Sequence, residues 1–173
     1  MAFDRKDFVK LLENSYSAYY NIIKEDLPQD LPMEFRADYF QRGEKFWLLK
    51  SIPMYGNETN EYAYIFSADS FDEDMIDKCI TYALDDGLPR VKPHKEHQYT
   101  NIKTIFIATD FTADAERKIK NTEFQKTYNH SFWGYSNLLN SAVDVDSETV
   151  YTNRAGHEMK AYFRKLFAAQ KKE

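Results

Sequence analysis

A helix whose two ends are both marked in the sequence constrains the fold of this chain more than any other feature. Ser70 is a favourable N-cap residue, and Glu73 three positions later completes a capping-box pattern. A stripe of apolar residues at helical spacing follows, made up of Ile76, Cys79, Ile80, Ala83 and Leu84. Gly87 suits the left-handed position after a helix, and Pro89 prevents its continuation. The sequence therefore predicts a helix that starts after Ser70 and ends before Gly87.

The residues before this helix predict one further helix and then strands. Apolar residues at helical spacing indicate an amphipathic helix over residues 4–25, which ends before Pro28. Alternating or continuous apolar residues then indicate strands at 35–40, 46–49 and 61–68. Because no helical pattern separates these strands, we expect an antiparallel meander of three strands, with the strand at 46–49 in the centre.

Helices and strands alternate in the rest of the chain. A basic loop is expected over 88–100, followed by a buried strand at 102–108. Thr112 is a suitable N-cap for a helix that reaches to about residue 127. One or two strands are expected at 133–145, a turn at 146–148, a strand at 149–151 and a final helix at 157–169. This order predicts a single α/β (α+β) domain over residues 1–173, with a mixed sheet.

The composition fits a globular domain and argues against several other classes of protein. The 173 residues suit one domain, and a hydrophobic content of 43% suffices for a packed core. No apolar run approaches the roughly 20 residues of a membrane helix. The N-terminus lacks the apolar core of a secretion signal, and the single cysteine, Cys79, excludes an internal disulfide. We therefore expect a cytoplasmic protein with no membrane partner.

Charge is spread unevenly along the chain, whose net charge is −5. Residues 56–86 contain nine acidic side chains and one basic side chain, whereas residues 151–173 contain six basic and two acidic ones. Ordinary solvated faces produce such an asymmetry, and so does a dipolar surface that meets a partner. An acidic total disfavours nucleic-acid binding, which requires neutralisation of phosphates, but it does not exclude a local basic groove.

The expected element order invites one comparison with a known family. The first two-thirds of the chain run helix, three strands, helix, strand, and the third strand reads Glu61-Tyr62-Ala63-Tyr64. This order resembles the core of restriction-endonuclease-like nucleases, which implies an acid on the second core strand and an acid-x-Lys triplet on the third, where they hold a metal. Here the third strand lacks the lysine, and the second, at 45–51, carries no acid, although Glu44 precedes it. The resemblance therefore covers the order of elements and not the catalytic motif.

Four carboxylates are candidates for the catalytic site of a metal-dependent phosphoester hydrolase: Glu44, Glu61, Asp110 and Asp144. Asp110 follows the strand at 102–108, and ligands of open α/β sheets gather at the carboxyl ends of strands. Asp144 alternates with Asp146 and Glu148, a spacing that puts three carboxylates on one face of an extended chain, where they could hold Mg²⁺ or Ca²⁺. Each also fits an ordinary turn, cap or surface role. A divalent metal is therefore possible, and no other cofactor is expected.

A second set of residues could bind an anion or another ligand: Arg90, Lys92, His94, Lys95, His97 and Arg154. The first five belong to the basic loop at 88–100, which forms a small positive patch. His94 and His97 have the H-x-x-H spacing with which two imidazoles share a zinc ion, although the neighbouring lysines would repel a cation. Arg154 lies in the loop before the final helix, where it could be presented to a ligand or form part of the approach to that helix.

Several common catalytic motifs are missing from the sequence. It contains no glycine-rich phosphate loop, no G-x-S-x-G elbow and no Cys-x-x-Cys pair. We therefore favour a non-enzymatic domain that binds an unknown protein or small molecule, and we keep a metal-dependent phosphoester hydrolase as the alternative. The two differ in whether three of the four carboxylates lie within ligand distance of one point.

Overall fold

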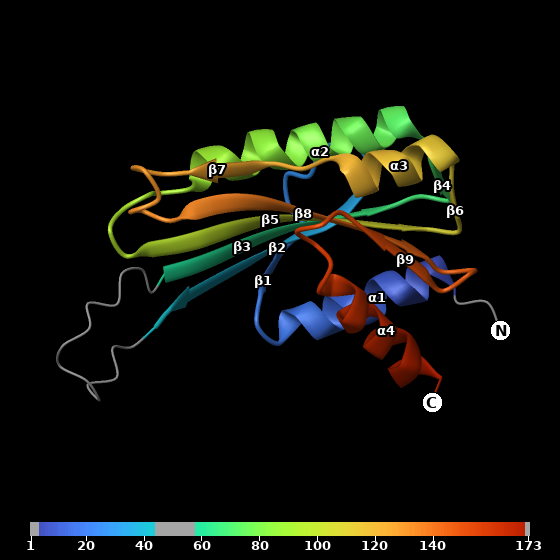
Figure 1. Ribbon diagram of the computed structural model, residues 1–173. Helices are drawn as coiled ribbons and strands as arrows, with labels where there is room; N and C mark the ends of the chain where they lie inside the picture. Colours follow the sequence, from blue (N-terminus) through green and yellow to red (C-terminus); the bar gives the residue numbers. More distant parts are fainter. Residues whose placement is uncertain (1–3, 44–57, 172–173) are drawn as a thin grey trace.

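The computed structural model describes residues 4–43 and 58–171, which form a single α+β domain of three layers. The helices are α1 (Arg5–Ser17), α2 (Glu73–Gly87), α3 (Ala113–Asn121) and α4 (Met159–Gln170), and a 3-10 turn, η1 (Leu88–Arg90), follows α2. Figure 1 shows α2 and α3 on one face of a central sheet and α1 and α4 on the other. None of the helices in these residues has the length and apolarity needed to cross a membrane.

The sheet is mixed, as the alternation of helices and strands predicts. Its strands are β1 (Asn21–Ile23), β2 (Met33–Arg42), β3 (Glu58–Ser67), β5 (His97–Ala108), β7 (Gln125–Thr127), β8 (Tyr135–Asp144) and β9 (Thr149–Thr152). The order is β1-β2-β3-β5-β8-β7, and β9 also pairs with β8. Strands β3, β5 and β8 are parallel, because α2 and α3 connect them, and the other pairings in this sheet are antiparallel. Two short strands, β4 (Ser70–Phe71) and β6 (Asp110–Phe111), form a separate parallel pair.

The helix marked most clearly by the sequence is present, but its cap lies two residues later than predicted. Asp72 is the N-cap of α2, and its carboxylate accepts a hydrogen bond of 2.8 Å from the backbone N–H of Met75. Ser70 lies in β4 instead, opposite Asp110 of β6. Pairing with a strand distant in sequence therefore decides which of two suitable residues caps the helix.

The C-terminal end of α2 also differs from the prediction. Gly87 has a φ of −78° and is the last helical residue, and η1 continues the chain past it. A Cβ atom at this position would lie 3.0 Å from Ile102 Cδ1 and 3.1 Å from the hydroxyl oxygen of Tyr64. Close packing against the sheet, and not a left-handed backbone, therefore explains the glycine.

The N-terminal helix is shorter than the sequence predicts, and this changes the meander. Helix α1 ends at Ser17, and Asn21–Ile23 pairs with β2 as strand β1, with Asn21 opposite Asp38. The antiparallel meander consists of β1, β2 and β3. The strand predicted at 46–49 lies outside the described residues. Strand pairing overrides helical spacing here because residues at the end of a short helix gain more hydrogen bonds in the sheet.

Three boundaries in the second half are corrected for similar reasons. Strand β5 begins at His97, within the loop predicted at 88–100. Helix α3 has the predicted cap, Thr112, but ends at Asn121 instead of near 127, and the Thr122 hydroxyl donates to the Lys118 carbonyl at 2.7 Å. Residues Gln125–Thr127 then pair with β8. The final helix, predicted at 157–169, is α4 within two residues at its start and one at its end.

Two hydrophobic cores lie on opposite faces of the sheet. The core beneath α1 and α4 contains large buried side chains that include Phe8, Leu12, Phe35, Ile105 and Phe163. The core beneath α2 and α3 contains Tyr64, Phe66, Phe106 and Ile119, together with the predicted stripe residues Ile76, Cys79, Ile80 and Ala83. Residues of β3 and β5 alternate between the two cores, so their polar residues are also divided between the faces.

One side chain closes a gap at the edge of the sheet. β7 pairs with β8 as far as Asn137 and β9 pairs from Ser141 onward, which leaves residues 138–140 of β8 between them. The buried Asn153 amide accepts a hydrogen bond from the backbone N–H of Asn140 at 3.1 Å and donates to the Leu138 carbonyl at 2.9 Å. Asn153 therefore satisfies backbone groups that a continuous neighbouring strand would otherwise satisfy.

Candidate functional site

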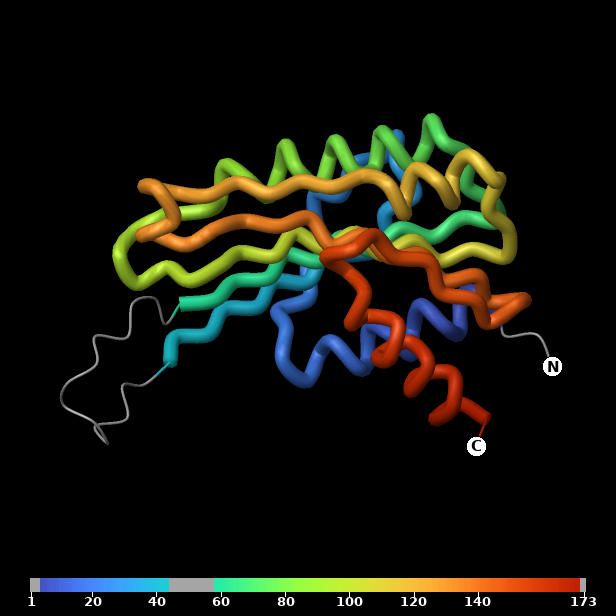
Figure 2. The backbone as a smooth tube through the Cα atoms, in the orientation of Figure 1, coloured from blue at the N-terminus to red at the C-terminus, as the bar shows by residue number. Residues whose placement is uncertain are grey.

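Tyrosines from separate parts of the chain gather around one ion pair on the sheet face that carries α1 and α4. We call this set the tyrosine platform, and its members are Tyr20, Tyr39, Glu61, Tyr99, Lys103 and Tyr135. They come from the turn after α1 and from β2, β3, β5 and β8. In Figures 1 and 2, β3, β5 and β8 extend beyond α1 and α4 at their amino ends, and no described helix covers this half of the face. Tyr99 and Tyr135 belong to these amino ends, whereas Tyr20 follows α1 and its ring centroid lies 4.4 Å from that of Tyr16.

The ion pair between Lys103 and Glu61 lies at the centre of the platform. Both side chains are largely buried, with 12% of Lys103 and 16% of Glu61 exposed. Lys103 and the hydroxyl of Tyr20 donate to the same oxygen of Glu61, Oε2, and Lys103 Nζ lies 3.4 Å from the Tyr20 hydroxyl. An ammonium group has three N–H donors, and a carboxylate offers about four lone-pair sites. The cluster therefore retains hydrogen-bonding capacity that it does not use internally.

Two pairs of tyrosine rings flank this ion pair. The rings of Tyr20 and Tyr39 have centroids 5.3 Å apart, and those of Tyr99 and Tyr135 stack at 6.0 Å with an angle of 26° between their planes. All four side chains are half-buried. The surface thus combines rigid apolar rings with hydroxyl groups, which lets it make both apolar and polar contacts.

The hydroxyls of Tyr20 and Tyr99 have raised pKa values. Burial raises the pKa of Tyr20, and the neighbouring Tyr16 and the charge of Glu61 raise it further. Burial also raises the pKa of Tyr99, again with a contribution from Glu61. Both hydroxyls therefore keep their protons and can donate hydrogen bonds.

The candidate carboxylates are separated in the structure. Glu61 lies opposite Asn101 of β5, whereas Asp144 lies opposite Ala108, seven residues further along that strand. At 3.3 Å per residue this corresponds to about 23 Å. Glu44 lies outside the described residues. In residues 4–43 and 58–171, no group of three or more His, Cys, Asp or Glu side chains is arranged to hold a metal ion.

The other two carboxylates serve the local backbone or a neighbouring side chain. Asp110 lies in β6, is exposed, and accepts a hydrogen bond of 3.2 Å from the Ser70 hydroxyl. Asp144 ends β8 and accepts hydrogen bonds of 3.0 Å from the backbone N–H groups of Asp146 and Ser147. These contacts stabilise the two turns.

In the structure, β2 takes the place that corresponds to the second core strand of restriction-endonuclease-like nucleases. The sequence places that strand at 45–51, outside the described residues, whereas the strand that pairs antiparallel with β3 is β2, which carries Asp38. Asp38 forms ion pairs with Arg36 and Arg90 beside α2, while Glu61 lies on the opposite face of the sheet. These two carboxylates therefore do not share a site.

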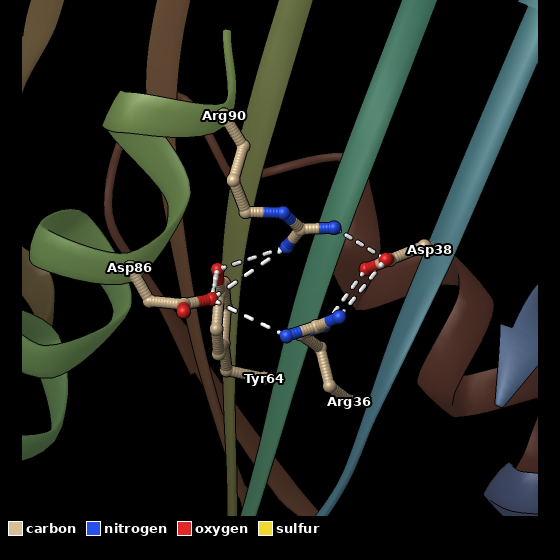
Figure 3. A network of polar contacts seen from close by, with 5 residues as sticks. All are labelled: Arg36, Asp38, Tyr64, Asp86 and Arg90. Carbon is tan, nitrogen blue, oxygen red and sulfur yellow. Dashed lines mark hydrogen bonds and ion pairs between the residues drawn. The ribbon is translucent and has the colours of Figure 1, made fainter. Parts of the chain in front are cut away.

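Arg90, which the sequence places in a basic patch, belongs to a closed network on the α2 face. Figure 3 shows its five members, Arg36, Asp38, Tyr64, Asp86 and Arg90. Arg36 Nε lies 3.1 Å from Asp38, and Arg90 contacts Asp38 and lies 3.6 Å from Asp86. The Tyr64 hydroxyl donates to Asp86 at 2.7 Å. Two positive and two negative charges balance each other, so Arg90 is not available as a free anion-binding group.

The two histidines have separate partners. The ring of His97 is buried; its Nδ1–H donates to the Trp133 carbonyl at 2.7 Å, and its Nε2 accepts from the Thr100 hydroxyl at 2.9 Å. His94 Nε2 lies 2.6 Å from the carboxylate of Glu58. These contacts give His97 a structural role, and the two rings do not face a common point.

The remaining basic candidates are exposed. Lys92 and Lys95 lie between η1 and β5, whereas Arg154 lies between β9 and α4. Lys92 and Lys95 therefore remain together in the loop that the sequence suggests, whereas Arg154 lies in another loop.

The sequence pattern does not identify the tyrosines and Lys103 of the platform as a site. None of them belongs to a motif, and each also fits an ordinary half-buried strand position. The sequence offers one signal: Tyr39 and Tyr135 lie in predicted strands, and Tyr99 lies in the predicted basic loop. Only the pairing register shows that they meet.

A family model described as a domain of unknown function (DUF8052) matches residues 4–165. No curated protein and no solved structure matches the chain. The matched range contains the whole tyrosine platform and the whole closed network, so both belong to the domain that the family model describes.

Proposed function

The chain belongs to the family of the domain of unknown function DUF8052, and we propose that it is a non-enzymatic binding module whose tyrosine platform holds a segment of a protein partner. The observation that carries this proposal is the gathering of four half-buried tyrosines around a central Lys103–Glu61 pair, where no described helix covers the sheet. A cytoplasmic location is part of the proposal and is supported by the free, buried Cys79.

The chemistry of the platform suits a peptide segment. Tyrosine is enriched at protein interfaces because its ring offers a large, rigid contact surface and its hydroxyl makes hydrogen bonds. A peptide group presents one donor and one acceptor, which complement the carboxylate of Glu61 and the ammonium group of Lys103. Because these two charges compensate each other, a largely uncharged segment fits best.

The alternative, a metal-dependent phosphoester hydrolase, requires carboxylates that converge on a metal ion. Glu61 and Asp144 are about 23 Å apart along the strands, at 3.3 Å per residue, which argues against this use of them. Thermal melts of the purified protein with EDTA, Mg²⁺, Mn²⁺, Ca²⁺ and Zn²⁺ test the alternative. A metal ion that binds the folded chain and is present at one hundred times its Kd raises the free energy of unfolding by about 2.7 kcal/mol. The hydrolase alternative requires a rise of this size with at least one of the metals.

A library of random linear peptides displayed on phage provides a defined test of the platform. Peptides selected on the immobilised full chain are synthesised with a fluorescent label, and their Kd is measured by anisotropy. We expect Tyr99→Ala to weaken binding about 30-fold, which corresponds to about 2 kcal/mol for a central tyrosine. Lys103→Met, which keeps most of the side-chain volume, weakens binding as well.

Tyr19→Ala is the matched control, since Tyr19 neighbours Tyr20 in the chain but is 80% exposed. This variant keeps the affinity of the wild type. Circular dichroism and thermal melts verify that each variant is folded. Selected peptides that bind Tyr99→Ala and Lys103→Met as tightly as the wild type, or a selection that enriches no platform-dependent peptide, refute the proposal.

A further inference from the structure

Two asparagines of neighbouring strands, Asn101 of β5 and Asn137 of β8, lie opposite each other beside the tyrosine platform, and we call them the amide pair. Asn101 also lies opposite Glu61 of β3, which in turn lies opposite Tyr39 of β2. Since Tyr39 and Glu61 both contact Tyr20, this row of residues is on the sheet face that carries α1. The amide pair and the platform therefore share one surface.

The amide pair has hydrogen-bonding groups that the fold does not use. Both side chains are half-buried, and neither has a hydrogen-bond partner among the described residues. In the same part of the chain, the one side-chain nitrogen or oxygen that is fully buried without a partner is Oε1 of Gln170, so the amide atoms of Asn101 and Asn137 reach the surface. A partner that covers them displaces water and must offer both donors and acceptors in its place.

The stacked rings of Tyr99 and Tyr135 lie next to the amide pair. They are two residues earlier on the same strands and on the same face, which is a distance of about 6.6 Å along each strand. A pair of rings and a pair of amides thus cross β5 and β8 side by side. The rings offer apolar contact, and the amides offer donors and acceptors.

The chain itself shows how an asparagine binds an extended backbone. The Asn153 amide accepts a hydrogen bond from the N–H of Asn140 and donates to the carbonyl of Leu138, two residues earlier in β8. In an extended chain these two backbone groups point to the same side, so one primary amide reaches both. In a helix the same groups bond to each other within the helix. A partner that an asparagine binds in this way is therefore extended.

We propose that Asn101 and Asn137 bind the backbone of an extended, uncharged segment of the protein partner. This inference rests on the proposed function and deepens it, because it names the conformation of the segment and the groups that are recognised. Neighbouring strands are about 4.8 Å apart, so a segment that reaches both amides runs across β5 and β8. Lys103 and Glu61 compensate each other, so a charged segment gains no net attraction there.

N-methylation of a peptide backbone tests the inference with the full chain. A platform-dependent peptide from the phage selection is methylated at one backbone nitrogen at a time, which removes one donor and keeps the side chain, and its Kd is measured by anisotropy. We expect methylation at one or two positions to weaken binding to the wild type by about 5-fold or more.

Substitution of each asparagine identifies the partner of the methylated group. Asn101→Ala and Asn137→Ala each weaken binding by about 10-fold, the effect of losing two hydrogen bonds. In one of these variants the sensitive methylation has little further effect, because the same hydrogen bond is not lost twice. Asn121, an exposed residue at the end of α3, provides the control, and Asn121→Ala keeps the wild-type Kd. Circular dichroism verifies that the variants are folded.

Several outcomes overturn the inference. They are a wild type that tolerates methylation at every position, an unchanged Kd for both Asn101→Ala and Asn137→Ala, and effects of methylation and substitution that add in full. Cellohexaose binding that Asn137→Ala abolishes would assign the amide pair to a glycan. Dimers in ultracentrifugation that Asn137→Ala abolishes would assign it to a second copy of the chain, and either result overturns the inference.

The same experiments separate this inference from the proposed function. Peptides that require Tyr99 but neither asparagine overturn the inference and leave the proposed function intact. A selection that yields no platform-dependent peptide refutes the proposed function and the inference together.

Discussion

Strand β3 contributes to two polar clusters, one on each face of the sheet, and both clusters combine tyrosine, carboxylate and cation. On the α2 face, Tyr64 joins the closed network shown in Figure 3. On the α1 face, Glu61 joins Tyr20 and Lys103 in the tyrosine platform. What differs is the element beside them, since α2 and η1 contribute Asp86 and Arg90 to the first cluster, whereas the turn after α1 contributes Tyr20 to the second.

The contacts of the two clusters follow from this difference. In the closed network each charged group has at least two partners, so the network connects β2, β3 and the end of α2. In the platform two donors converge on one carboxylate oxygen. Similar side chains thus form a network that joins three elements on the α2 face and a smaller, largely buried cluster on the α1 face.

The largest expected effect is on stability, from a substitution in the closed network. Asp86→Ala removes the acceptor of the Tyr64 hydroxyl, which belongs to a fully buried residue, and one partner of both arginines. An unpaired buried hydroxyl costs about 1–3 kcal/mol, so we expect the free energy of unfolding to fall by about 2 kcal/mol in urea denaturation. The neighbouring Asp85 is exposed, and Asp85→Ala changes stability by less than about 0.5 kcal/mol. If the two substitutions lower the free energy of unfolding equally, the network has no structural role.

An intermediate effect is expected in alkali. Burial and the hydrogen bond to Asp86 raise the pKa of Tyr64, whereas an unfolded tyrosine ionises near pH 10. Above about pH 10 the unfolded chain therefore binds fewer protons than the folded one, and the free energy of unfolding falls as pH rises towards the folded pKa. Tyr64→Phe lessens this slope by up to about 1.4 kcal/mol per pH unit.

Tyr20→Phe makes the same comparison on the platform. Burial also raises the pKa of Tyr20, so between about pH 10 and the folded pKa each hydroxyl contributes the same one-proton slope, and we expect a change of slope similar to that for Tyr64→Phe. Urea denaturation at a series of pH values between about 8 and 12 measures both slopes. An unchanged slope for Tyr20→Phe would show that the platform does not shield this hydroxyl as the closed network shields that of Tyr64.

The smallest effect is expected for the ion pair of the platform. The double variant Lys103→Met/Glu61→Gln replaces both charges by neutral side chains of similar size, which is often neutral for stability. We expect a change within about 0.5 kcal/mol, together with the loss of the platform's peptide binding. If this variant loses as much stability as Asp86→Ala, the platform is a structural cluster of the same kind as the network.

Local patterns predict the elements whose apolar faces lie against the sheet. The stripe from Ile76 to Ala83 in α2, the buried strand in β5 and the final helix all follow from residues close together in the sequence. The ends of the elements do not follow from nearby residues, because each end depends on pairing with a distant residue. Ser70 leaves the helix because it pairs with Asp110, and Asn21 leaves α1 because it pairs with Asp38.

The candidate site depends even more on distant pairing. Tyr20, Glu61, Lys103 and Tyr135 meet only through the parallel register of β3, β5 and β8 and the turn after α1. A shift of that register by one residue would place Glu61 and Lys103 on the other face. The charge pattern, in contrast, directs attention to the loop at 88–100, in which Arg90, His94 and His97 each have separate partners.

The amide of Asn153 has a consequence for the protein in a crowded solution. A strand edge with free N–H and C=O groups is a template for pairing with another molecule, and such pairing leads to aggregation. On the outer side of β8, the three residues between β7 and β9 would form such a template, but the Asn153 amide engages backbone groups there. The Asn153 amide therefore occupies backbone groups that would otherwise be open to pairing with another molecule, at the edge opposite β1.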